Sequence, residues 1–233
     1  PVPARERWPR HQHENFYWLQ EDYLRQRQIG QAWHWTVWRP QLILGESQGS
    51  QMNVIPALGV YAALLREQGQ PLSFPGGPPF VVEAIDADIL AQACEWATTT
   101  TASHNEIFNI TNGDVFVWQN VWPAIANAFG MEVGPPTPCS LAEEMPKRAT
   151  EWAALVQKYH LRAPTNLQEF VGQSFILADF TFGFGSQNLS PPPMLVSTIK
   201  LRQAGFHTCM DTEDCFRKWI HRFQELRWLP PVR

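Results

Sequence analysis

The sequence predicts an α/β protein with a largely parallel sheet, few strands and many helices. Short apolar segments with strand character, at residues 33–45, 80–86 and 106–114, alternate with longer segments whose apolar residues recur at helical spacing. Strands separated by helices are typical of parallel sheets that helices cover. About three strands are few for such a sheet, so these strands alone form an incomplete one.

The first elements follow from local signals. Residues 1–14 are polar and proline-flanked, and we expect an N-terminal loop there, followed by a single domain over residues 15–233. Asn15 can accept a backbone N–H and so cap a helix, which Gly30 ends. The segment 33–45 alternates and then turns through Arg39-Pro40, which predicts a buried strand that leaves the sheet at the proline.

The remaining predicted elements are mostly helices, and several of them have recognisable capping or helix-ending residues. They are predicted over residues 53–69, 86–98, 117–130, 140–161, 166–182 and 211–226. Gly69 is a helix stop and Asp86 a helix cap. Ser140 and Glu143 form a capping box, and Pro146 should break the helix that they begin.

Charge and composition exclude several classes of function. The net charge is −4 with both signs spread along the chain, so no basic stripe indicates a nucleic-acid partner. The sequence contains no apolar run of about 18 residues, so it predicts no membrane span. The N-terminus lacks the apolar core of a signal peptide, and we expect a cytoplasmic protein. The four cysteines lack CxxC spacing and are expected to be free thiols, although Cys209 and Cys215 could meet across a tight turn.

Motifs for phosphate and metal binding are weak. No GxGxxG follows a strand, and the "GFG" of residues 183–185 follows a helical pattern and lacks the third glycine. His11, His13 and Glu14 could hold a metal, but their spacing favours a solvated loop, so no metal site is predicted. His34, on a strand face, is more often a core histidine than a general base.

The stretch "ENFYWLQEDYL", residues 14–24, contains the candidate catalytic groups. Glu21 and Asp22 could act as acid and base, but neighbours on a helix point about 100° apart, which favours a solvated face or a cap. A tyrosine phenol donates a proton only if its anion is stabilised, and no lysine precedes Lys147. The residues alone therefore leave a catalytic phenol open and favour aromatic packing.

Several segments, taken together, resemble one family. They are "ENFYWLQEDYL", "WTVWRPQLILG", "SQMN", "DADILAQACEWA", "NEIFNITNGDVFVWQNVWPAIANAFGM" and "GFHTCMDTEDCFRKWI". From about Trp8 onward the chain resembles the progesterone 5β-reductase/iridoid synthase-like group of atypical extended short-chain dehydrogenases, in the NAD-dependent epimerase/dehydratase superfamily. The chain looks like the C-terminal part of such a protein, with the N-terminal dinucleotide-binding half missing.

The resemblance implies a Rossmann-type fold and an NADP(H)-dependent reductase of secondary metabolism. Such an enzyme would reduce an enone or carbonyl of a hydrophobic small molecule, and hydride chemistry would belong to the cofactor. The alternative is a truncated, catalytically impaired homologue that binds a ligand or a partner. Without the dinucleotide-binding half an apolar sheet face would be exposed, and a homodimer is then possible.

The same resemblance implies a set of site residues. Trp18 stands where the family keeps its catalytic tyrosine, and Tyr17 lies one residue away. The implied cofactor-binding residues are Pro40, Ile43, Leu44, Ser50, Gln51 and Met52, and the implied substrate residues are Asn53, Leu177 and Phe180. For Met52 and Phe180 plain core packing is an equal alternative.

Overall fold

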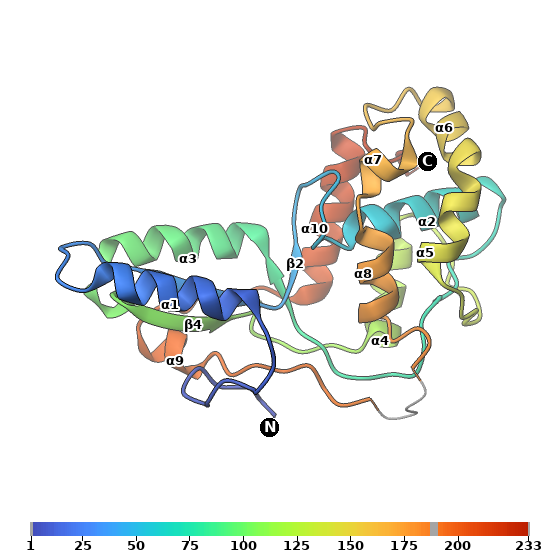
Figure 1. Cartoon of the computed structure of the whole chain (residues 1–233). Helices are drawn as coiled ribbons and strands as arrows, with labels where there is room; N and C mark the ends of the chain where they lie inside the picture. Colours follow the sequence, from blue (N-terminus) through green and yellow to red (C-terminus); the bar gives the residue numbers. More distant parts are fainter. Residues whose placement is uncertain (1, 187–190, 233) are drawn as a thin grey trace.

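Helices and short parallel strands alternate along the chain (Figure 1) in the computed structural model, which describes residues 2–186 and 191–232. The strands are β1 (Thr36–Pro40), β2 (Leu42–Leu44), β3 (Ala84–Asp86) and β4 (Glu106–Ile110). The helices are α1 (Phe16–Gln28), α2 (Ile55–Glu67), α3 (Ala87–Thr99), α4 (Trp118–Ala128), α5 (Leu141–Glu144), α6 (Ala149–Lys158), α7 (Leu167–Val171), α8 (Ser174–Thr181), α9 (Ile199–Gln203) and α10 (Thr212–Glu225), with short 3₁₀ turns at Thr101–Ser103 and Met145–Arg148. Among the described residues no helix is both long and apolar enough to cross a membrane.

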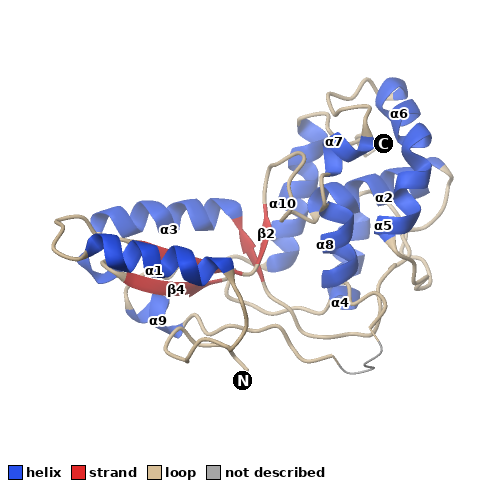
Figure 2. Cartoon of the chain, viewed as in Figure 1, coloured by secondary structure: helices blue, strands red, loops and turns tan. Residues whose placement is uncertain are grey.

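The strands form two parallel pairs (Figure 2). β1 pairs with β4, with Val37 opposite Ile107, and β2 pairs with β3, with Ile43 opposite Ile85. The α/β class with few parallel strands and many helices is therefore confirmed. The segment 33–45 gives two strands where one was predicted, because the chain breaks at Gln41 and each half takes a different partner.

The chain forms two lobes: the β1–β4 pair lies in the smaller one, and the β2–β3 pair lies where the two lobes meet (Figure 1). In the smaller lobe α3 covers one face of the β1–β4 pair, where Trp96 packs against Trp38 and Phe108. The larger lobe is mostly helical and contains the main core. Several of its buried aromatic residues pack edge to face, a favourable geometry for aromatic pairs: Trp118 and Trp122 each pack so against Phe182.

Asp86 joins three elements at the end of β3. Its side chain is fully buried, and Oδ1 caps α3 by accepting from the N–H groups of Asp88 (2.8 Å) and Ile89 (3.2 Å). From α10, Lys218 Nζ donates to both carboxylate oxygens (3.1 and 2.8 Å) and Trp219 Nε1 donates to Oδ2 (2.9 Å). Burial raises the pKa of Asp86. The hydrogen bonds and the positive charge of Lys218 lower the pKa by more than burial raises it, so it lies below its ordinary value.

Local signals predicted the element boundaries well. Asn15 accepts from the N–H of Tyr17, and Ser140 Oγ accepts from the N–H of Glu143, as expected of caps. The 3₁₀ turn that contains Pro146 breaks the helical segment 140–161. The single helix predicted over residues 166–182 is wrong: Gly172, with φ of 56°, separates α7 from α8. Helix α9 was not predicted.

The thiols are free, as predicted. Cys94 and Cys209 are exposed, Cys139 is half-buried and Cys215 is buried. Cys209 and Cys215 do not pair, because Cys215 lies inside α10, where its Sγ contacts Asp86 Oδ2 at 3.4 Å.

Glu83 is a buried carboxyl just before β3. It is 7% exposed, and its Oε2 accepts from the N–H of Val196 at 2.7 Å. The pKa of Glu83 is raised to about 7, mainly by burial. The hydrogen bond from Val196 lowers the pKa in part, and the negative charge of Asp114 raises it. The folded state therefore holds this proton more tightly than the unfolded state. The protonated Glu83 therefore contributes its whole stabilising effect below about pH 4.5, and this effect is lost as the pH rises towards 7.

We expect Glu83→Gln to stabilise the protein at pH 8 but not at pH 4.5. Glutamine keeps the acceptor for Val196 and removes the cost of ionising a buried carboxyl, about 2–3 kcal/mol. Urea denaturation at the two pH values measures the difference, and Glu132→Gln, at an exposed carboxyl, is the control. An equal effect of Glu83→Gln at both pH values would contradict this account.

Candidate functional site

An ion pair fixes helix α1 against β1. Arg39 donates to Glu21 Oε1 through Nη2 (2.6 Å) and Nε (3.2 Å), and Arg10 donates to Glu21 Oε2 (3.0 Å). Glu21 is only 6% exposed. Burial raises its pKa, but the hydrogen bonds from Arg39 and Arg10 hold the pKa below its ordinary value. The carboxylate is therefore ionised and structural.

This geometry corrects the interpretation of the acidic pair. A solvated face or a cap was expected for both residues, and only Asp22 is exposed. Glu21 is instead the one buried residue of α1, while Phe16, Leu19 and Tyr23 are 60%, 73% and 61% exposed. The apolar stripe of this helix thus faces outward, because the inner face is used for the contact with Arg39.

The same contacts set the direction of α1. Glu21 meets Arg39 near the end of β1, and Arg25 lies over the ring of Trp35, just before β1 begins, at 5.8 Å. The helix therefore runs antiparallel to the strand. Trp18, about one turn before Glu21, lies at the carboxyl end of β1, where open α/β sheets bind their ligands.

Trp18 is enclosed by aromatic and basic groups. His13 stacks on its ring with centroids 4.8 Å apart, and the guanidinium of Arg10 lies 5.7 Å from the centroid. Its indole N–H donates to no group within residues 2–186 and 191–232. Tyr17 is 56% exposed and packs on Phe16, so it does not share the direction of Trp18.

Residues 45–53 form a loop between β2 and α2 that carries four of the implied site residues. Asn53 is buried: its Nδ2 donates to Gly45 O (2.7 Å) and Ser47 Oγ (2.9 Å), and its Oδ1 accepts from the N–H of Ile55 (3.0 Å). Its polar atoms therefore shape the loop. Ser50 Oγ accepts from the N–H of Met52 (3.1 Å), and Gln51 and Met52 are exposed.

The loop is attached to the start of α8. Gly49 N–H donates to Phe170 O (2.8 Å), and a Cβ on Gly172 would lie 2.5 Å from the backbone of Gly49, so the two backbones are in direct contact. Helix α8 then presents an exposed apolar face: Ile176 is 60% and Phe180 64% exposed, and Leu177 is half-buried.

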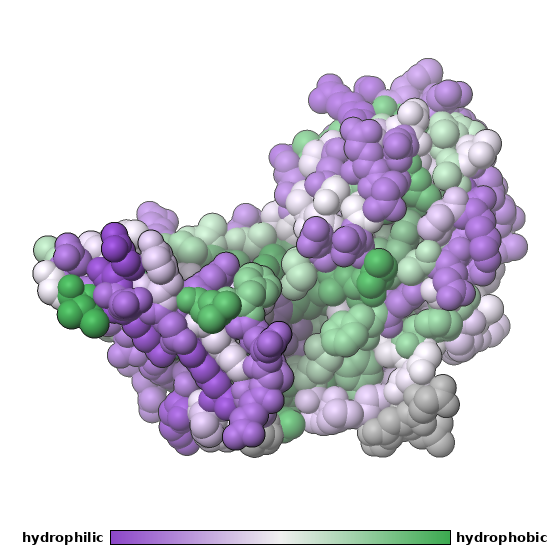
Figure 3. Space-filling view, in the orientation of Figure 1, coloured by the Kyte–Doolittle hydropathy of each residue, from purple (hydrophilic) through white to green (hydrophobic). Residues whose placement is uncertain are grey.

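These elements surround the hollow between the two lobes. In Figure 3 apolar surface gathers at this hollow, over the region of α8. Pro40 and Ile43 are half-buried, and Leu44 is fully buried, backbone included, so Leu44 presents no exposed atom to a ligand in this structure. The loop and α8 thus lie at this hollow, and helix α1 begins near its edge (Figure 1). Sequence reasoning missed Ile176, whose position one turn before Phe180 was the available signal.

The β1–β2 segment suits the nicotinamide end of a dinucleotide better than its phosphates. The β1–β2 segment offers backbone groups and apolar side chains of the kind that a nicotinamide ring needs. A diphosphate, however, needs open backbone N–H groups, such as those of a free helix N-terminus. At α3 and α10 these groups are occupied by the carboxylates of Asp86 and Asp211, which would repel phosphate. These two helix N-termini are therefore closed to a phosphate, whereas α2, which follows the loop of residues 45–53, has no side-chain cap.

Comparison with known proteins identifies relatives of the chain. Residues 2–183 match the family model of the PRISE-like Rossmann-fold domain. The chain is 32% identical to (S)-8-oxocitronellyl enol synthase of Antirrhinum majus and 31% identical to 3-oxo-Delta(4,5)-steroid 5-beta-reductase of Arabidopsis thaliana. Each alignment covers 98% of this chain and 58% of the relative, so the chain spans little more than half the length of these curated relatives.

Solved structures agree on the fold alone. RMD from Pseudomonas aeruginosa, complexed with NADPH, has a TM-score of 0.60 at 13% identity, over 96% of this chain and 60% of that one. The UDP-glucose 4-epimerase of Thermus thermophilus, in complex with NAD, has a TM-score of 0.55 at 17% identity, over 96% and 59%. With its parallel strand pairs and the match over most of its length, the chain belongs to the PRISE-like Rossmann-fold family.

Proposed function

We propose that this chain forms the substrate side of an NAD(P)H-dependent reductase that acts on an enone or carbonyl of a hydrophobic small molecule. One observation carries the proposal: the ion pair of Glu21 with Arg39 fixes the direction of α1 along β1, which turns the start of α1, with Trp18, toward the carboxyl end of the strand. The names of the plant relatives, an enol synthase and a steroid reductase, suggest chemistry on such molecules.

Each group at the hollow has a role that suits this reaction. The exposed apolar side chains of Met52, Ile176 and Phe180 would bury an apolar substrate. The indole N–H of Trp18 would donate a hydrogen bond to the substrate oxygen, where negative charge develops. A bound NADPH or NADH would supply the hydride. Asn53 acts indirectly, by holding the loop that carries Met52.

A second candidate function is ligand or partner binding without turnover, and Trp18 favours it. An indole N–H is no proton acid at neutral pH, so a step that needs a proton would be slow. The outward apolar stripe of α1, formed by Phe16, Leu19 and Tyr23, would suit a partner, and a homodimer is one such case.

Fluorescence titration of NADPH with the full chain tests the proposed function. We expect a saturable change in NADPH fluorescence that a hydrophobic enone enhances. Phe180→Ser should weaken the effect of the enone about tenfold, because an aromatic contact is lost. Ile29→Ser, at the exposed C-cap residue of α1, is the matched control. If NADPH shows no saturation at millimolar concentration, and the enone binds regardless of Phe180→Ser, the reductase site is not at this hollow.

A further inference from the structure

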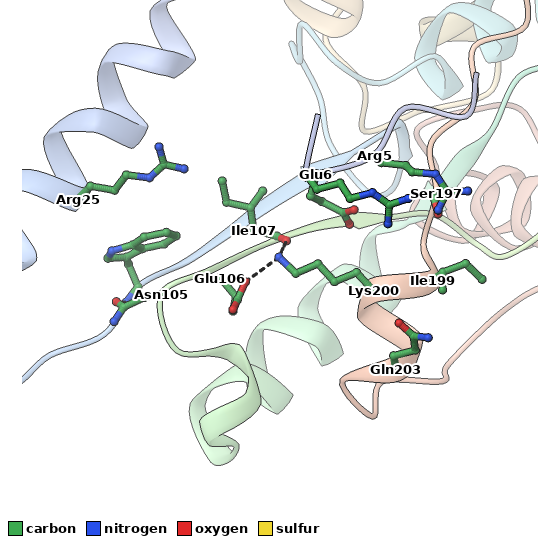
Figure 4. A pocket seen from close by; sticks show the side chains of 12 residues that line it. Arg5, Glu6, Arg25, Asn105, Glu106, Ile107, Ser197, Ile199, Lys200 and Gln203 are labelled. Atoms are coloured by element: carbon green, nitrogen blue, oxygen red, sulfur yellow. Dashed lines mark hydrogen bonds and ion pairs between the residues drawn. The ribbon is translucent and has the colours of Figure 1, made fainter. Parts of the chain in front are cut away.

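A second concave site lies away from the hollow, at the amino ends of β1 and β4. It is a cavity of about 450 Å³, within the range that small-molecule sites occupy. Trp35, just before β1, and Glu106, at the start of β4, line it, together with residues of α1, α9 and the N-terminal segment (Figure 4). It faces the side of the strand pair opposite α3, because Ile107 lines it while Phe108 packs against Trp96.

The cavity is basic although the chain is acidic. Arg5, Arg7, Arg25 and Lys200 line it, against Glu6 and Glu106, which leaves two positive charges in excess in a chain of net charge −4. An unbalanced basic cavity in an acidic protein attracts anions.

Part of this charge is already paired within the cavity. Lys200 Nζ binds Glu106 (2.6 Å) and donates to Ile107 O (2.8 Å), as the dashed lines of Figure 4 mark. Glu6 Oε1 accepts from the N–H of Asn109 at 2.9 Å, and Arg5 donates to Ser197 Oγ at 3.4 Å.

Arg7 and Arg25 are the cations that remain available. Arg7 is exposed and makes no hydrogen bond or ion pair with the residues that the structure describes. Arg25 is 47% exposed, and its ion-pair distances to Asp22 and Glu21 are long, at 3.8 and 4.0 Å. A guanidinium offers paired N–H groups that match the oxygens of a carboxylate or phosphate.

The rest of the lining is apolar. The ring of Trp35 lies under Arg25, and Ile107 and Ile199 complete an apolar wall. Such a wall binds a flat ring through burial and stacking.

We propose that this cavity binds a small aromatic oxyanion, a phosphate or a carboxylate. Arg7 and Arg25 hold the oxyanion, and Trp35 and Ile107 pack against the ring. The site needs no nicotinamide cofactor and is independent of the proposed reductase function.

Ligand-observed NMR and calorimetry on the full chain without cofactor test this site. The probes are phenyl phosphate, benzoate, inorganic phosphate and neutral benzyl alcohol. We expect phenyl phosphate, benzoate or both to bind, with an affinity that falls as salt rises, and the tighter of the two identifies the oxyanion. Arg7→Gln and Arg25→Gln should each weaken binding about tenfold, since each removes a charge-assisted hydrogen bond.

Arg27→Gln, in the same helix but outside the cavity, is the control and should leave affinity unchanged. Three results would overturn the proposal: no binding of either aromatic anion at millimolar concentration, equal affinity for benzyl alcohol, or full affinity in the double variant of Arg7 and Arg25. Inorganic phosphate that binds as tightly as phenyl phosphate would contradict the role of Trp35 and Ile107.

Discussion

Asp86→Ala is expected to destabilise the protein by about 4 kcal/mol, measured by urea denaturation followed through tryptophan fluorescence. The substitution removes the cap of α3, worth about 1 kcal/mol. It also leaves the Nε1 of Trp219 without its acceptor and removes the buried partner of Lys218. Breaking a buried, hydrogen-bonded charge pair typically costs about 3–5 kcal/mol, and here Lys218, one-third exposed, can recover part of that cost in water.

Asp88→Ala is the matched control. Asp88 also binds Lys218, at 2.7 Å, and lies in the first turn of the same helix, but its side chain is 60% exposed. Exposed pairs contribute about 0–1 kcal/mol. A cost of Asp86→Ala no larger than that of Asp88→Ala would contradict the central position given to Asp86. Asp86→Asn, which keeps acceptors for the cap, serves if the alanine variant does not fold.

Because the pKa of Asp86 is lowered, the loss of stability in Asp86→Ala depends on pH. Because the folded pKa lies below the ordinary value near 4, the stabilisation is present above about pH 4 and is lost as the pH falls through the folded pKa. Acid should therefore narrow the difference in stability between the native protein and Asp86→Ala.

Local chemistry made much of the fold predictable. The caps at Asn15, Asp86 and Ser140 depend only on a side chain and the next few backbone groups, so they were recognisable without a structure. The alternation of strands and helices likewise predicted that the strands pair in parallel, although not which strands pair.

Long-range contacts were not predictable in this way. The stripe of Phe16, Leu19 and Tyr23 has the spacing of a buried face, yet Glu21 is buried instead, because Arg39 lies beside it across the fold. Similarly, no local signal shows that Gly49 and Gly172 bring their backbones together.

The candidate site depended on the family resemblance. Neither periodicity nor spacing distinguishes Met52 or Phe180 from core residues, whereas the structure leaves them 54% and 64% exposed, so core packing is excluded for both. Their assignment to a cofactor and a substrate, like that of Ser50, Gln51 and Leu177, stays a prediction. The basic cavity at the other end of the strands carries no motif, since its residues come from five separate segments.

Trp18→Tyr is expected to increase the rate of NADPH-dependent enone reduction. A phenol at the carboxyl end of β1 would add a proton donor beside the substrate oxygen, and such a donor typically contributes on the order of 100-fold. Trp18→Phe keeps an aromatic ring for His13 to stack on but has no donor, and it should reduce the rate below that of the native chain.

The rates of the native chain, Trp18→Tyr and Trp18→Phe, measured with NADPH and the same hydrophobic enone, therefore test the central claim most directly. The account predicts the order Tyr above Trp above Phe. Equal rates in the three proteins, or no reduction in any of them, would contradict the position of residue 18 at a reductase site.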